Sequence, residues 1–241
     1  MSKKNKITLA VLIIIFILAI IYLVVINSNK ELNRSDALKF KEEYESINTQ
    51  KDEEGNYKYK SLSISDNNNV KYSDANEVID VLKNGGTAVI YFGFPECPWC
   101  RTMISPFLDV ASEFKNNKIL YFNAKPIRDT KHLDENGNII TDKEGTEEYK
   151  EIVSLLYDYL GPYEGLNDNT VKRLYFPTVV FVKSGEVIGI HIGTVDSQED
   201  VKVPLDDNQL NELKQIFRDN FNKLNETDSS DTSSCDDSKK C

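Results

Sequence analysis

The chain lacks an excess of basic residues and has very little histidine or cysteine. Of its 241 residues, 29 are Lys or Arg and 39 are Asp or Glu, so the formal net charge is −10. This balance, and the lack of a basic stripe or a glycine-rich phosphate loop, argue against a nucleic-acid partner. Two His and four Cys offer few combinations for a four-ligand zinc site, and no motif implies a dissociable cofactor.

Two of the four cysteines form a C-x-x-C pattern at Cys97 and Cys100, with an apolar run before it (88–94) and a helical pattern after it (101–114). A strand that leads through C-x-x-C into a helix is typical of a thiol–disulfide redox centre. Pro98 favours the first turn of a helix, so Cys97 is expected at the N-terminus of the helix that follows. There, free backbone N–H groups and the helix dipole favour a thiolate. We predict Cys97 as the nucleophile and Cys100 as the resolving thiol.

Other uses of these cysteines stay open. The pair could be a static structural disulfide, or half of a zinc site whose other ligands would come from Cys235, Cys241, His132 and His191. Cys235 and Cys241 stand in a polar tail, where the simplest expectation is a disulfide between them. The alternative is that this flexible tail carries electrons to or from the C-x-x-C pair.

One long uncharged run lies near the N-terminus. Ile7 to Ile26 has no charged residue and matches the length of a helix that crosses a bilayer. The lysine-bearing residues 1–6 fit a cytoplasmic end, and no small-x-small cleavage site follows the run. We therefore predict an uncleaved, single-pass anchor in the cell membrane, with the C-terminal domain extracytoplasmic. A buried core helix is the alternative.

The rest of the chain divides by composition. Residues 27–71 are predicted to be a linker and N-terminal extension, in which Ser35 caps a polar helix over 36–47 and a short strand lies at 59–64. Residues 72–224 are predicted to form one α/β domain, and residues 225–241 a disordered tail with two Cys. The elements expected in the domain are a helix at 75–83 capped by Ser73, a strand at 87–93, the C-x-x-C helix, a strand at 118–124, a helix at 146–160, a hairpin of strands 178–182 and 187–193, and a helix at 207–224.

This order of elements resembles the thioredoxin superfamily. A second motif that carries the resemblance is Phe176-Pro177-Thr178, directly before a strand. The resemblance covers 72–224, with an enlarged middle segment at 125–173, and implies a thioredoxin-like fold, a central mixed sheet flanked by helices. It also implies that the Phe176–Pro177 bond is cis and faces the cysteines, so that Phe176 and Pro177 bind an extended substrate segment. Trp99 is expected to offer the substrate an apolar surface, or else to pack back on the domain.

Some residues depart from that superfamily's pattern. Tyr91 stands where the family has a buried acid, and a tyrosine stays protonated at neutral pH. This predicts either a slower resolving step or another base acting through water. Glu96 is expected to raise the pKa of Cys97 and Arg101 to lower it, so the two effects oppose each other.

The anchor, the CPWC motif and the enlarged domain together resemble membrane-anchored extracytoplasmic thioredoxin-like proteins of Gram-positive bacteria, some of them called bacteriocin transport accessory proteins. The predicted function is thiol–disulfide exchange with cysteines of secreted or surface proteins and peptides, with a membrane redox partner that resets the pair. The residues favour neither oxidation, reduction nor isomerisation. The alternative is a non-catalytic binding module of an export or surface-assembly complex.

Overall fold

The structure, a computed structural model, describes the backbone of residues 3–114 and 116–226, with their side chains except in 3–11 and 26–35. Cys235 and Cys241 lie outside the described residues, as does nearly all of the tail predicted to be disordered. Within the described part, every strand and helix predicted for the α/β domain is present and in the predicted order, with three further strands among them.

A five-stranded mixed sheet is the centre of the described domain, with the strand order β1-β3-β2-β6-β7. The strands β1 (Val70–Tyr72), β3 (Ile119–Phe122) and β2 (Ala88–Phe92) are parallel to one another. The strands β6 (Thr178–Lys183) and β7 (Glu186–Ile192) form the predicted hairpin, and β6 lies antiparallel to β2. The prediction of a central mixed sheet flanked by helices is therefore confirmed.

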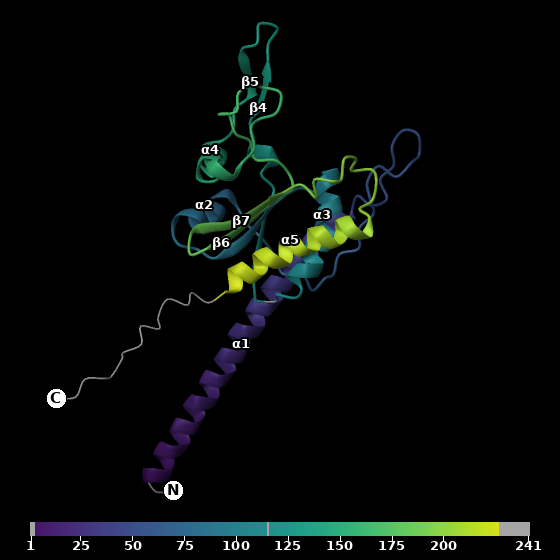
Figure 1. Cartoon of the computed structure of the whole chain (residues 1–241). Coiled ribbons are helices and arrows are strands. Elements are labelled where there is room, and N and C mark those ends of the chain that lie inside the picture. The colour runs from purple at the N-terminus through teal and green to yellow at the C-terminus, as the bar shows by residue number, and fades with distance from the viewer. Residues whose placement is uncertain (1–2, 115, 227–241) are drawn as a thin grey trace, which may run out of the picture.

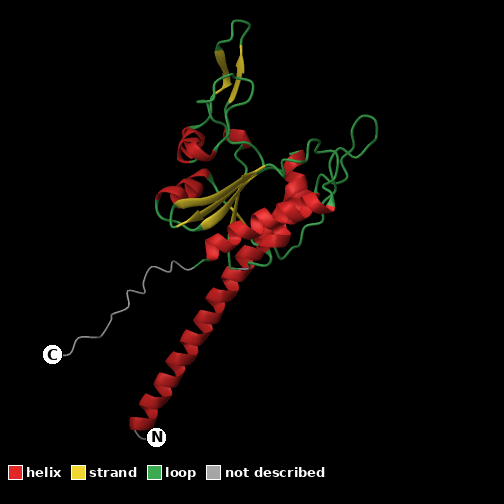
Figure 2. Ribbon diagram, in the orientation of Figure 1, coloured by secondary structure: helices red, strands yellow, loops and turns green. Residues whose placement is uncertain are grey.

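Helices cover both faces of this sheet (Figure 1, Figure 2). The C-terminal part of α1 (Lys3–Glu45), α3 (Pro98–Ala111) and α5 (Asp207–Asn225) pack on one face. On the other face lie α2 (Ala75–Lys83) and α4 (Glu147–Leu155).

Strand β2 is apolar at every position because it is buried on both faces of the sheet. Val89 and Tyr91 point into the core beneath α1, α3 and α5, whereas Ala88, Ile90 and Phe92 point into the core beneath α2 and α4. A strand that is covered on both faces has no solvent side, so it reads as a continuous apolar run. The C-x-x-C segment follows the end of this buried strand and leads into α3.

The first helix corrects the predicted linker. Helix α1 is continuous from Lys3 to Glu45, so residues 27–34 are helical and Ser35 does not begin a helix. The physical reason is that 27–45 contains neither Gly nor Pro and is rich in good helix formers, so nothing in it stops the helix. Side chains 12–25 on this helix are exposed. In the part of the chain that the structure describes, no helix is both long and apolar enough to cross a membrane.

The segment 59–64, predicted as a short strand, is irregular in the structure. It runs beside α1 without strand partners, and Asn48 supplies the bonds that a neighbouring strand would have supplied. The amide nitrogen of Asn48 donates to the Leu62 carbonyl at 2.7 Å, and the Leu62 N–H donates to the Asn48 oxygen at 3.0 Å. Leu62 and Ile64 are buried, so this segment belongs to the core.

Smaller differences concern element ends and added strands. Asp74, and not Ser73, is the N-cap of α2. The helix predicted at 146–160 is shorter, because α4 ends at Leu155 and a 3-10 turn follows. Three strands were not predicted. The strand β1 forms an edge of the central sheet, and β4 (Thr130–Leu133) and β5 (Ile139–Lys143) form a separate hairpin around the predicted polar turn. Figure 1 shows this hairpin projecting away from the sheet.

Candidate functional site

The C-x-x-C segment lies where β2 ends and α3 begins, as predicted. Cys97 is the N-cap of α3, with extended backbone angles (φ −72°, ψ 117°), and Pro98 is the first helical residue. The sulfur of Cys97 accepts a hydrogen bond from the backbone N–H of Cys100 at 3.2 Å. A cysteine sulfur thus takes the place that a Ser or Asp oxygen usually has at a helix N-terminus, which favours its anionic form.

The two cysteines are free thiols in different surroundings. Cys97 is 5% exposed and Cys100 is 0% exposed. Hydrogen bonding from the Cys100 thiol, backbone N–H bonds from Cys100 and Trp99, and the charge of Lys125 together lower the pKa of Cys97, against the opposing effect of burial. Burial, followed by the neighbouring Cys97, raises the pKa of Cys100. One sulfur is therefore disposed to be a thiolate and the other to hold its proton.

The Phe176–Pro177 segment faces this pair. Its peptide bond is cis, as predicted. The carbonyl oxygen of Phe176 accepts a hydrogen bond from the Cys97 thiol at a sulfur–oxygen distance of 3.6 Å. Pro177 is buried, whereas Phe176 and Trp99 are half-buried. The predicted residues Cys97, Cys100 and Phe176 are thus brought together by β2, α3 and the start of β6.

Cations that the sequence analysis missed stand beside Phe176. The Lys125 ammonium lies 4.2 Å from the centre of the Phe94 ring, and the Arg128 guanidinium lies 4.8 Å from that of Phe176. The two phenyl rings meet edge to face, with centroids 5.5 Å apart. Both cations come directly after β3, and parallel neighbours such as β2 and β3 end at the same edge of a sheet. The positions of Lys125 and Arg128 after β3 could therefore have predicted that both lie near the C-x-x-C segment, which follows β2.

Arg101 has a structural role that the sequence analysis did not predict. Its side chain is wholly buried and bonds to the N-terminal extension, while its effect on the pKa of Cys97 stays a prediction. The guanidinium donates to the carbonyl oxygens of Tyr44 (2.8 Å), Lys60 (2.7 Å) and Pro95 (3.2 Å) and to the side-chain oxygen of Asn48 (2.6 Å). A buried guanidinium is tolerated when such acceptors satisfy its donors. Arg101 therefore fastens the active-site helix to the extension.

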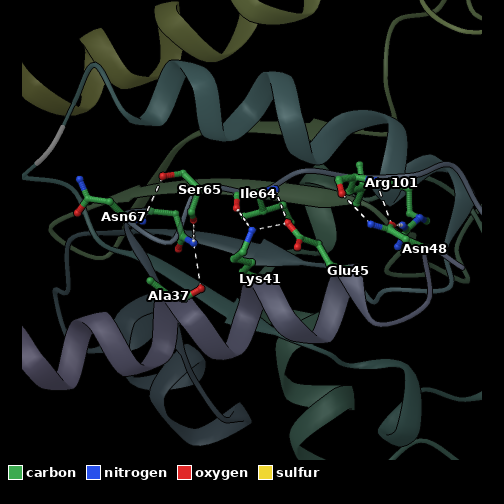
Figure 3. A network of polar contacts seen from close by, with 10 residues as sticks. Ala37, Lys41, Glu45, Asn48, Ile64, Ser65, Asn67 and Arg101 are labelled. Carbon is green, nitrogen blue, oxygen red and sulfur yellow. Dashed lines mark hydrogen bonds and ion pairs between the residues drawn. The ribbon is translucent and has the colours of Figure 1, made fainter.

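Further polar contacts fix the extension along α1 (Figure 3). Lys41 pairs with Glu45 at 2.8 Å and donates to the Ile64 carbonyl at 2.7 Å. The N–H of Ile64 donates to Glu45 at 2.6 Å, and Asn68 donates to the Ala37 carbonyl at 3.1 Å. Hydrogen bonds from α1 thus fix the irregular segment after it at Ile64 and Asn68. Arg101 of α3, the helix that carries Cys100, bonds to the same segment at Lys60.

The histidines weighed as zinc ligands lie in different places. His132 bonds to Asp142 on the projecting hairpin at 2.7 Å, and His191 of β7 packs edge to face on Phe217. Within the described residues, no group of His, Cys, Asp or Glu is placed to hold a metal ion.

Comparison of the sequence with known proteins adds no relative: no family model and no curated protein matches the chain. The functional argument therefore rests on the site itself.

Proposed function

We propose that the protein is a membrane-anchored, extracytoplasmic thiol–disulfide oxidoreductase with a thioredoxin-like fold. The observation that carries the proposal is the unequal thiol pair at the start of α3, in which Cys97 has a lowered pKa and Cys100 a raised one, beside the cis Phe176–Pro177 bond. A structural disulfide needs no such difference between its sulfurs, whereas exchange chemistry uses it.

The reaction follows from the two pKa directions. The Cys97 thiolate attacks one sulfur of a substrate disulfide, the substrate S–S bond breaks, and a mixed disulfide forms while the first substrate thiolate leaves. Cys100 then attacks the Cys97 sulfur and loses its proton as the second substrate thiolate leaves. The substrate gains two electrons, and the Cys97–Cys100 disulfide holds the oxidised state. Run in reverse, the same steps oxidise a substrate dithiol.

Substrate binding is assigned to the surface around Cys97. Trp99, two residues after Cys97, and Phe176, whose carbonyl oxygen accepts a hydrogen bond from the Cys97 thiol, supply half-buried aromatic groups, and Pro177 follows Phe176. Proteins or peptides with cysteines in extended segments fit this surface. Because each turnover leaves the pair in the opposite redox state, a membrane redox partner is needed to reset it. The chemistry needs no dissociable cofactor.

The proposed anchor is the apolar run Ile7 to Ile26 within α1. Its support is the lack of charge over that run and the exposure of the described side chains between Leu12 and Val25, which have no protein surface to cover them. Helix α1 continues from this run into the domain, where Arg101 of α3 donates a hydrogen bond to the Tyr44 carbonyl of α1.

A second candidate function is a non-catalytic binding module of an export or surface-assembly complex. The low exposure of the residues Cys97 and Cys100, 5% and 0%, favours it, because a buried pair is less accessible to a folded substrate.

The two functions predict different fates of a trapped substrate. The full chain in detergent, with Cys235→Ser and Cys241→Ser to silence the tail, is mixed with a disulfide-containing peptide. With Cys100→Ser added, Cys97 should accumulate a stable mixed disulfide, visible by mass spectrometry, because no resolving thiol remains. The matched control, Cys97→Ser, should accumulate none. If neither variant traps the peptide, exchange at this site is refuted and the binding module is favoured.

A further inference from the structure

A group of cations is joined to Cys97 through aromatic rings. The Phe176 carbonyl accepts the hydrogen bond of the Cys97 thiol, so Phe176 is in direct contact with the reacting sulfur. The Arg128 guanidinium lies 4.8 Å from the centre of the Phe176 ring, and the Lys125 ammonium lies 4.2 Å from that of Phe94. Because these two rings meet edge to face, both cations belong to one cluster of side chains that reaches Cys97.

Arg173 extends this cluster beyond Arg128. The Arg128 guanidinium donates a hydrogen bond at 3.4 Å to the carbonyl oxygen of Leu174, the residue that follows Arg173. The Arg173 guanidinium lies 4.1 Å from the centre of the Tyr163 ring and 5.7 Å from that of Tyr175. Burial, and after it the charge of Arg173, lowers the pKa of Arg128, as expected for two like charges that lie near each other.

We call Lys125, Arg128 and Arg173 the basic cluster. In the part of the chain that the structure describes, none of the three forms an ion pair with a carboxylate. Asp129, which stands next to Arg128 in the sequence, pairs with Lys131 at 3.3 Å, although its charge also acts on Arg128. The carboxylate nearest in the sequence therefore has a cation of its own.

Two exposed carboxylates stand near the partners of the cluster. Glu96 precedes Cys97, and its charge acts on the Arg101 guanidinium. The backbone N–H of Glu164 donates to the Tyr175 hydroxyl at 2.7 Å, while its side chain is exposed. Among the described residues, neither carboxylate is ion-paired with the basic cluster. The three cations are thus held by aromatic rings, which leaves them free to bind a carboxylate from outside.

The two guanidinium groups have hydrogen-bond donors to offer. Stacking on a ring holds a guanidinium in place and leaves the N–H groups at its edge free to donate. Arg128 and Arg173 are half-buried, and Lys125 is exposed. The Nε atom of Arg173 is buried and has no hydrogen-bond partner among the described residues. A carboxylate bound beside both arginines would accept charge-assisted hydrogen bonds and reduce the repulsion between them.

We propose that the basic cluster selects substrates whose cysteine lies in an acidic peptide segment, and that it binds a carboxylate of that segment while the substrate sulfur meets Cys97. The inference rests on the proposed thiol–disulfide exchange and adds the substrate class to it. The steps of the exchange stay as described above.

The charge of the whole chain makes this preference unexpected. At a net charge of −10, the protein as a whole repels an acidic peptide. A faster reaction with an acidic peptide must therefore come from a local group of cations. The sign of the preference separates the basic cluster from the average charge of the surface.

Two synthetic peptides test the proposal. Each carries thionitrobenzoate in a mixed disulfide on its single cysteine; one has aspartates on both sides of that cysteine, and the other has asparagines at the same positions. The reduced full chain in detergent, with Cys235→Ser and Cys241→Ser, is mixed with each peptide. The Cys97 thiolate attacks the peptide sulfur, the S–S bond breaks, and coloured thionitrobenzoate leaves. The ratio of the two second-order rate constants is then compared between protein variants, so that a changed pKa of Cys97 cancels.

The acidic peptide should react about fivefold faster, the effect of a few ion pairs near the surface. Lys125→Gln, Arg128→Gln and Arg173→Gln together should bring the ratio to one or below. About 0.5 M salt should also bring it close to one in the parent protein, because salt screens these charges. The matched control is Lys118→Gln, an exposed lysine that precedes β3, whereas Lys125 follows that strand; its ratio should equal that of the parent.

Equal rates in the parent protein, or a faster reaction with the asparagine peptide, would overturn the inference and leave the proposed exchange standing. So would a ratio that the triple substitution leaves unchanged. If the triple variant fails to fold, the exposed Lys125→Gln alone should lower the ratio about twofold, and an unchanged ratio there overturns the inference equally. Release from neither peptide would refute the exchange itself, and the inference with it.

Discussion

The N-terminal extension and the hairpin β4–β5 both add to a sheet-and-helix core, but they are built in different ways. The extension, from the end of α1 to residue 69, buries Phe40, Tyr44, Leu62 and Ile64 in the main core. In the hairpin every residue of β5 is exposed, including Ile139 and Ile140. The difference teaches that the extension is part of the core beside the helix that carries the cysteines, whereas β5 of the hairpin contributes no buried residue to a core.

The largest effect should come from breaking the link between the extension and the active-site helix. Arg101→Met keeps the aliphatic stem but leaves buried acceptors without donors, which should lower the free energy of unfolding by about 3 kcal/mol. Urea denaturation of the full chain in detergent measures this. Arg218→Met is the matched control: it breaks a pair with Glu113 that lies on the surface, and it should change the urea midpoint little. Equal losses in the two variants would show that the extension is not fastened through Arg101.

The next prediction compares one apolar residue of the N-terminal extension with one of the hairpin β4–β5. Leu62→Ala in the extension should cost about 3 kcal/mol, because it leaves a cavity in the core. Ile140→Thr in the hairpin should change the free energy of unfolding by less than about 0.5 kcal/mol, since the side chain is already in water. The same denaturation experiment measures both. A large loss for Ile140→Thr would mean that the hairpin is packed in solution.

The smallest effect concerns the middle segment, where Lys125 reaches the site. Its positive charge helps to lower the pKa of Cys97, so Lys125→Gln should raise that pKa and shift alkylation of Cys97 to higher pH. At neutral pH the iodoacetamide rate should fall by a factor of about two to three, the effect of one partly screened charge. Lys150→Gln, at an exposed site on α4, should leave the profile unchanged. A profile that also stays unchanged in Lys125→Gln would remove Lys125 from the site.

Local patterns predicted much of the fold and the centre of the site. The apolar run of β2 and the C-x-x-C segment each lie within a few neighbouring residues, so their spacing predicted them. The position of Phe176-Pro177 beside the cysteines was predicted from the resemblance to the thioredoxin superfamily. The helix α2 was predicted with its observed bounds, because Gly85-Gly86 ends it sharply.

The contacts that were missed join residues far apart in the chain. Tyr44 and Tyr91 meet across 47 positions, and Arg101 reaches Tyr44 across 57, with no spacing rule to connect them. The linker was mispredicted for a different reason, since Ser35 is a good N-cap residue inside a helix that nothing interrupts. Tyr91 was noticed as a departure, but its partner could be found only once α1 was placed against the sheet.

The central claim is that Cys97 and Cys100 form a reversible redox pair, and a redox titration tests it most directly. The full chain in detergent, with Cys235→Ser and Cys241→Ser, is equilibrated with mixtures of reduced and oxidised glutathione, and free thiols are then counted by alkylation and mass spectrometry. The account predicts one reversible two-electron transition, reached from either direction and abolished by Cys97→Ser. A pair that keeps one redox state across the whole series, or that fails to return, would contradict it.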